Sequence, residues 1–261
     1  MRAQALGPDL IVFVSRIWQT ACTAVRSGEE GFLIDSPVYP DELEALPEVL
    51  ERAGFPVSGL LVTHADWDHL LARLAFPGAA IGCGEPTAHR LRREPGSAQR
   101  ELRRFDEEHY IDGRAPLSLS AFQSLPVPGR LSLGPEHEIE LHIAEGHTAD
   151  GTAYLLPWLS VLVCGDYLSP VEIPTIEEGG TIDAYAATLE RLGRMLGRVK
   201  TVVVGHGGVI ARDQAQWILE QDRAYLEGLR HRGADASLPT GRRTPAQQRR
   251  HRDNADRVRR A

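Results

Sequence analysis

The chain has 261 residues, of which 42% are hydrophobic and 25% are charged. This composition is ordinary for a globular protein and supplies enough apolar residues for a sizeable core. No apolar run approaches the roughly 20 residues that a membrane-spanning helix needs, which argues against a membrane protein. We expect a cytoplasmic protein, because the first residues read as a strand and not as a signal peptide.

The first half of the chain alternates short apolar runs with turn residues. This pattern predicts strands at 10–15, 21–26, 31–35, 59–63 and 79–83. A helix is expected to begin at Pro40, because Leu43, Leu46 and Leu50 recur at helical spacing. One or two helical turns are expected after His69.

Residues 85–130 differ in character, because they are charged at first and then rich in proline and serine. We expect short helices and a long loop there. The second half of the chain then resumes a regular pattern. It predicts strands at 137–144, 152–156, 159–164 and 201–204, a helix at 182–196, and a last amphipathic helix that ends near residue 229.

Charge is distributed unevenly along the chain. The net charge is −7, yet residues 241–261 hold eight arginines against Asp253 and Asp256, which leaves the remainder near −13. An acidic body is a poor nucleic-acid surface, so we do not expect a nucleic-acid partner. We divide the chain into a folded domain, residues 1–232, and a basic tail, residues 233–261, which we expect to be disordered or a loosely attached helix.

The three cysteines are Cys22, Cys83 and Cys164. Their number is odd and no CxxC pair occurs, so the sequence indicates neither a disulfide framework nor a zinc knuckle. Each lies in an apolar, strand-like context. We therefore expect buried free thiols.

The segment that follows the predicted strand at 59–63 is rich in metal-binding side chains. His64, Asp66, Asp68 and His69 fall within six residues. Imidazole and carboxylate groups together suit zinc, iron or manganese. Side chains alternate along an extended segment, so His64 and Asp66 can point the same way, and a helical turn near His69 could bring the other two to the same site.

Three more residues of the same types follow later strands. His147, Asp166 and His206 each come directly after a glycine, at or just beyond the end of a predicted strand. Glycine permits the sharp turn that aims the next side chain out of a strand end. Loops on a rigid scaffold often carry binding residues, so these three are further candidate ligands.

In this order the motifs resemble those of the metallo-β-lactamase superfamily. The first motif of that family is His-x-His-x-Asp-His, and this chain has His-x-Asp-x-Asp-His, with Asp66 in place of the second histidine. The later ligands of the family, a His, an Asp and a His, match His147, Asp166 and His206. The resemblance covers about residues 10–230. It implies an α/β fold, a four-layer αββα sandwich with its metal site at one edge of the two sheets.

The resemblance also implies roles for the seven candidates. His64, Asp66 and His147 would bind a first metal ion, Asp68, His69 and His206 would bind a second, and Asp166 would bridge the two. The implied cofactors are two divalent metal ions, zinc by family, with iron or manganese favoured by the carboxylate of Asp66. A hydroxide held between the ions would be the nucleophile, and Asp68 would orient it or take up a proton.

The function that these features predict is a dimetal hydrolase acting on a small-molecule ester, thioester, lactone or phosphodiester. One alternative is a diiron or mononuclear-iron redox enzyme acting on oxygen, nitric oxide or sulfur, which Asp66 suggests. Another is a non-catalytic metal- or RNA-binding protein that uses the tail. Asp35 is expected to hydrogen-bond a ligand and not to bind metal. No candidate ligand lies beyond His206, so removal of the tail is expected to leave the chemistry intact.

Overall fold

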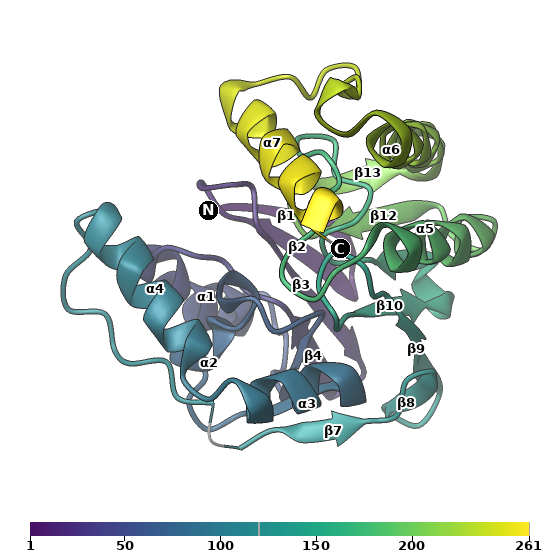
Figure 1. Ribbon diagram of the computed structural model, residues 1–261. Helices are drawn as coiled ribbons and strands as arrows, with labels where there is room; N and C mark the ends of the chain where they lie inside the picture. Colours follow the sequence, from purple (N-terminus) through teal and green to yellow (C-terminus); the bar gives the residue numbers. More distant parts are fainter. Residues whose placement is uncertain (120, 261) are drawn as a thin grey trace.

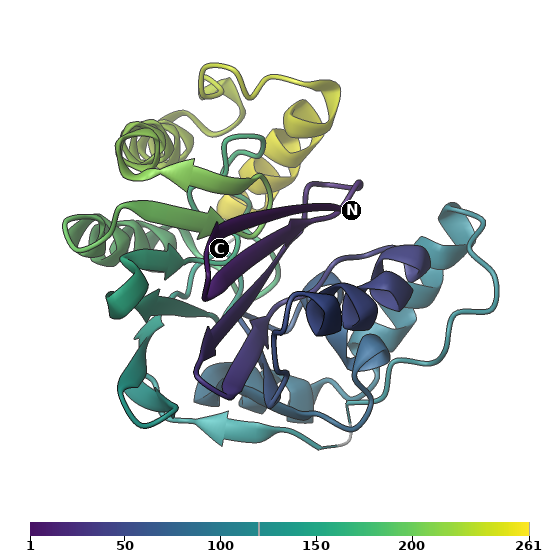
Figure 2. The same ribbon diagram turned by 180° about the vertical axis from the view of Figure 1, so that it is seen from behind.

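The computed structural model describes residues 1–119 and 121–260. Residue 120, in the predicted loop, and residue 261, at the end of the predicted tail, lie outside the described residues. Two sheets pack face to face, and helices cover the outer face of each sheet (Figures 1 and 2). The predicted αββα sandwich is confirmed.

The first sheet has seven strands, in the order β1-β2-β3-β4-β5-β6-β7. They are β1 (Arg2–Gly7), β2 (Leu10–Val14), β3 (Ala21–Ser27), β4 (Glu30–Ile34), β5 (Gly59–Val62), β6 (Ala80–Gly84) and β7 (Gln123–Leu125). The pairs from β1 to β4 are antiparallel, and those from β4 to β7 are parallel. Parallel neighbours need crossover segments, which here are the helices on the outer face.

The second sheet has six strands, in the order β13-β12-β11-β10-β9-β8. They are β8 (Gly129–Leu133), β9 (His137–Ile143), β10 (Thr152–Leu156), β11 (Val161–Val163), β12 (Thr201–Val204) and β13 (Gly208–Ala211). Only β11 and β12 pair in parallel, and the other neighbours are antiparallel.

Four helices pack on the first sheet, and two on the second. The first group is α1 (Pro40–Arg52), α2 (Ala72–Ala75), α3 (Glu85–Arg93) and α4 (Ser97–Glu108), and the second is α5 (Ile182–Leu196) and α6 (Arg212–Arg232). A further helix, α7 (Pro245–Arg260), lies beside α6 (Figure 1). In the described ranges, no helix is both long and apolar enough to cross a membrane.

The alternation of side chains along each strand builds three layers of core. In β2, Ile11 and Phe13 face the helices of the first sheet, whereas Val12 and Val14 face the second sheet. Residues two apart lie on the same face of a strand, so a fully apolar strand fills both layers at once. This explains why the strands read as continuous apolar runs.

Most of the predicted elements are present, with boundaries shifted by one or two residues. The helix at 182–196 and the strand at 152–156 have the predicted bounds. Residues 85–130 form α3, α4, an irregular segment and the short strands β7 and β8, of which only the helices and the loop were expected. β1 and β13 were not predicted as separate strands. The three cysteines are buried and free, as expected.

The tail is neither disordered nor a loosely attached helix, because it forms a helix that packs on the domain. Residues 245–260 form α7, whose Gln247, His251 and Asn254 are buried. Arg242, ahead of the helix, is 2% exposed and lies 2.6 Å from the carboxylate of Asp222 in α6. The buried stripe of α7 recurs at helical spacing, but apart from Ala255 it is made of amide and imidazole groups. An apolar pattern could not reveal it.

Candidate metal centre

The seven candidate ligands come together at one edge of the sandwich. One group of four follows β5, and the others follow β9, β11 and β12. The backbone at two of these strand ends lies very close to neighbouring atoms, which lets the side chains converge. A Cβ atom on Gly205 would lie 2.1 Å from Asp166 Oδ1, and one on Gly146 would lie 2.1 Å from the backbone nitrogen of Tyr185. These two positions, each directly before a candidate histidine, therefore require glycine.

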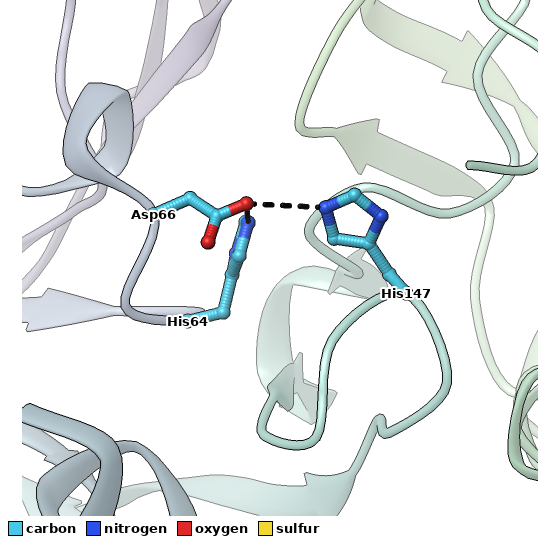
Figure 3. Close-up of side chains that lie close together, drawn as sticks. All are labelled: His64, Asp66 and His147. Carbon is cyan, nitrogen blue, oxygen red and sulfur yellow. Dashed lines mark hydrogen bonds and ion pairs between the residues drawn. The ribbon is translucent and has the colours of Figure 1, made fainter. Parts of the chain in front are cut away.

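His64, Asp66 and His147 form the first cluster (Figure 3). The carboxylate atom Asp66 Oδ2 lies 3.5 Å from His64 Nε2 and 3.3 Å from His147 Nε2. Figure 3 shows this oxygen between the two rings. The three donor atoms lie within 4.8 Å of one another, which is close enough to share one ion.

Asp68, His69 and His206 form a second cluster. Asp68 Oδ2 lies 3.7 Å from His69 Nε2 and 3.6 Å from His206 Nε2. A 3-10 turn at Trp67–His69 brings the adjacent Asp68 and His69 to the same side. This is the turn that the sequence required for these two residues to converge.

Asp166 lies between the two clusters. Its Oδ2 atom is 3.5 Å from His147 Nε2 and 3.2 Å from His206 Nε2, so one oxygen faces a ring of each cluster. Its Oδ1 atom lies 3.2 Å from His69 Nε2. The geometry is the one expected of a bridging ligand.

All four histidine rings present Nε2 to the centre, because Nδ1 is held from behind. The Nδ1 contacts are Thr63 Oγ1 at 2.9 Å for His64, Asp35 Oδ2 at 3.0 Å for His69, the Thr175 carbonyl at 2.8 Å for His147, and the Trp18 carbonyl at 3.2 Å for His206. A carbonyl can only accept, so Nδ1 carries the proton wherever a carbonyl holds it. Nε2 is then left as the metal-binding atom of a neutral ring.

Asp35 positions one histidine of each cluster. Its Oδ2 atom faces His69 and also accepts the hydroxyl proton of Thr63 at 2.9 Å, so the Thr63 oxygen is free to accept from His64 Nδ1. The backbone N–H of Thr63 donates to Asp35 Oδ1 at 2.7 Å. Asp35 therefore contacts one candidate ligand and hydrogen-bonds Thr63 beside another, without facing the centre itself.

The electrostatics of the metal-free centre show groups that need a positive counterpart. Burial raises the pKa of Asp66 and of Asp166, but the surrounding imidazoles outweigh burial and hold both pKa values well below the ordinary range. Burial lowers the pKa of His147 and of His206, but the nearby carboxylates prevail and raise each to about 9. Protons thus occupy positions for which a metal ion would compete.

The residues fit bound metal by a second criterion. Among the described residues, His64 Nε2, His69 Nε2 and Asp166 Oδ1 are buried and have no hydrogen-bond partner. Each nevertheless lies within 4 Å of another candidate ligand atom. Buried polar atoms without partners are costly, and an ion placed between them would satisfy all three.

The structure adds two charged groups that the sequence did not single out. The Arg90 guanidinium of α3 lies 2.8 Å from Asp66 Oδ1 and 2.9 Å from Asp150 Oδ1. Asp150, which is 1% exposed, accepts the backbone N–H of Ala65 at 2.9 Å. No local motif marks either residue, because Arg90 is 24 positions from Asp66 and 60 from Asp150.

The centre opens into a cavity of about 490 Å³. Asp66, Asp68, His147, Asp166 and His206 line it, together with aromatic and charged side chains that include Trp18, Trp67, Arg90, Glu177, Arg250 and Arg257. The last two belong to α7. The segment predicted to be a tail therefore forms part of the wall.

A sandwich that presents histidine and aspartate side chains from four strand ends is a scaffold able to hold metal at its edge. The family model of the metallo-beta-lactamase superfamily matches residues 16–206. The chain belongs to this superfamily. The match includes all seven candidate ligands and ends at His206.

Solved structures share the fold at low sequence identity. A metallo-beta-lactamase family protein of Thermus thermophilus is 21% identical, with a TM-score of 0.67 over 90% of this chain and 86% of that one. A metallo-beta-lactamase from Pontibacter korlensis is 16% identical, with a TM-score of 0.62 over 84% and 97%. The stereoselective inverting sec-alkylsulfatase Pisa1 from Pseudomonas sp. is 15% identical, with a TM-score of 0.66 over 88% of this chain. This chain covers only 42% of that protein.

Proposed function

We propose that this protein is a dimetal hydrolase that cleaves a small-molecule ester, thioester, lactone or phosphodiester. The observation that carries the proposal is the convergence of four imidazoles and three carboxylates at one edge of the sandwich, where five of the seven groups line an open cavity. Solved structures named as a β-lactamase and an alkylsulfatase share the fold, which supports hydrolysis as the class of reaction.

Two divalent ions, when bound there, would lower the pKa of a coordinated water and polarise the electrophile. Residues of the chain would orient the ligands and accept the proton. The histidines hold their rings in one orientation through their Nδ1 contacts. Asp68 lines the cavity and lies within 4 Å of His69 and His206, where it is placed to accept a proton from water. Cys164 is buried and its pKa is raised by burial, which argues against a thiolate nucleophile.

We propose zinc as the native metal, with iron as the alternative that the Asp66 carboxylate supports. The RNA-binding alternative has less support. Arg242, Arg250 and Arg257 pair with acidic side chains of the same chain, and α7 packs on the domain and is not a free basic tail.

The test combines metal analysis with a panel of ester, thioester, lactone and phosphodiester substrates. We expect about two metal ions per chain and turnover of one substrate class. Asp166→Asn should lose that turnover, whereas Asp213→Asn, an exposed position on α6, should keep it. Absence of turnover with a metal-loaded protein, together with oxygen uptake by an iron-loaded one, would replace the hydrolase with the redox enzyme.

A further inference from the structure

Asp66 presents its two oxygen atoms to different partners. Oδ2 faces His64 and His147 at 3.5 and 3.3 Å, on the side of the first cluster. Oδ1 points the other way and lies 2.8 Å from Arg90. A guanidinium nitrogen at this distance forms a charge-assisted hydrogen bond, which is stronger than one between neutral groups.

The position of Arg90 is itself fixed. The same terminal nitrogen that contacts Asp66 lies 2.9 Å from Asp150 Oδ1, and Arg90 Nε lies 3.5 Å from Glu94 on the next turn of the helix. Asp150 is buried and holds the backbone N–H of Ala65 with its other oxygen. The Arg90 side chain is 21% exposed, so solvent screens these contacts only in part.

Arg90 and Asp150 together connect the two loops that supply the first cluster. Asp150 lies three residues after His147, and the backbone group that it holds lies directly before Asp66. The pair is therefore placed to fix the separation of the two loops as well as the rotation of the Asp66 carboxylate. A residue with this placement can set how a ligand binds without binding the metal itself.

We propose that Arg90 determines the metal specificity of the first cluster by making Asp66 a one-oxygen ligand with a compensated charge. The inference rests on the proposed metal centre. With Oδ1 held by Arg90, only Oδ2 is available to an ion, so the coordination number stays low, as zinc prefers. The guanidinium also offsets the negative charge that Asp66 adds relative to the imidazole usual in this motif. Without Arg90, a carboxylate free to use both oxygens would suit manganese or iron better.

The test is metal competition and a spectrum, and it does not depend on activity. Wild type, Arg90→Met and Arg93→Met are stripped of metal and exposed to equimolar zinc and manganese, and the bound ratio is measured. Arg93, an exposed arginine on the same helix, controls for the loss of one positive charge. We expect the zinc-to-manganese ratio of Arg90→Met to fall about tenfold, with wild type and Arg93→Met alike. The cobalt-loaded Arg90→Met should show weaker visible absorption, because cobalt absorbs less as its coordination number rises.

The same comparison in an Asp66→His background tests whether Arg90 acts through Asp66. We expect the effect of Arg90→Met on the ratio to vanish there. An unchanged ratio and spectrum in the single variant, or an effect that persists beside His at position 66, would overturn the inference. A crystal structure of the zinc-loaded wild type covers the case in which Arg90→Met does not fold. Zinc bound by both Asp66 oxygens, or Arg90 displaced from Oδ1, would also overturn it.

The outcomes separate this inference from the proposed function. If the wild-type protein binds neither zinc nor manganese, the proposed metal centre is contradicted, and the inference is contradicted with it. If the wild-type protein binds metal and Arg90→Met behaves as Arg93→Met does, only the inference about Arg90 is contradicted.

Discussion

Substitution of Asn254 by alanine should weaken metal binding at a centre that Asn254 does not touch. Asn254 is 1% exposed on α7. Its Oδ1 accepts the N–H of Ile176 at 2.9 Å, and its Nδ2 donates to the Pro174 carbonyl at 2.7 Å. Thr175, between those two residues, supplies the carbonyl that holds His147 Nδ1 at 2.8 Å. The α7 helix thus fixes the segment that orients a candidate ligand.

The magnitude follows from the two backbone groups that Asn254→Ala leaves buried without partners. Each costs about 1–3 kcal/mol, so the free energy of unfolding of the metal-free protein should fall by about 2–4 kcal/mol as the segment partly relaxes. Zinc affinity should fall about tenfold, the lower end for residues that orient a ligand, because Asn254 acts through Thr175. Competition with a chromophoric chelator measures the affinity, and urea denaturation measures the stability.

The control is Asp253→Ala, an exposed neighbour on the same helix. Equal zinc affinity and equal stability in the two variants would show that α7 does not fix the segment that orients His147. Residues 173–176 would then hold His147 without α7. The same contacts reverse the expectation that residues 233–261 are dispensable. A protein truncated after residue 232 should lose zinc affinity by at least as much as Asn254→Ala.

Three further results are expected. Asp35→Asn should lower zinc affinity by about 10–100-fold, since it removes a charged partner behind one ligand ring and weakens the support of a second; unchanged affinity by chelator competition would contradict this. In the metal-free protein the pKa values of His147 and His206 are raised from 6.5 to about 9. Their contribution to stability is therefore complete below pH 6.5 and is lost as the pH rises towards 9. The melting temperature of the metal-free protein should fall across that window. A melting temperature that rises there would contradict the prediction. Arg242→Ala leaves a buried carboxylate unpaired and should cost about 3–5 kcal/mol in urea denaturation; a loss below about 1 kcal/mol would count against it.

Local patterns in the sequence predicted the strands and the seven candidate ligands, and the resemblance to the metallo-β-lactamase superfamily supplied the αββα architecture. Buried strands are short apolar runs, and the ligands follow their ends, at His147 and His206 directly after a glycine. The edge of the sandwich then brings strand ends of the two sheets together, as it does for His64 after β5 and Asp166 after β11. Their order along the chain matched the motifs of the superfamily, and this match is the basis for naming them candidate ligands.

The contacts that support the ligands could not be predicted in this way. Arg90 and Asp150 meet across 60 positions, and Thr175 acts through a carbonyl that every residue possesses. The α7 helix packs through the amide groups of Gln247 and Asn254, which form no apolar stripe in the sequence. Long-range polar contacts of this kind depend on the final geometry and leave no periodic trace in the sequence.

The proposed dimetal centre can be tested directly by anomalous diffraction from crystals of the zinc-loaded protein. The data are recorded above and below the zinc absorption edge. We expect two zinc peaks at the edge of the sandwich. One should lie among His64, Asp66 and His147, and the other beside His69 and His206, with a carboxylate between them. A centre that stays without a zinc peak, or zinc bound only elsewhere on the molecule, would contradict the proposed dimetal centre.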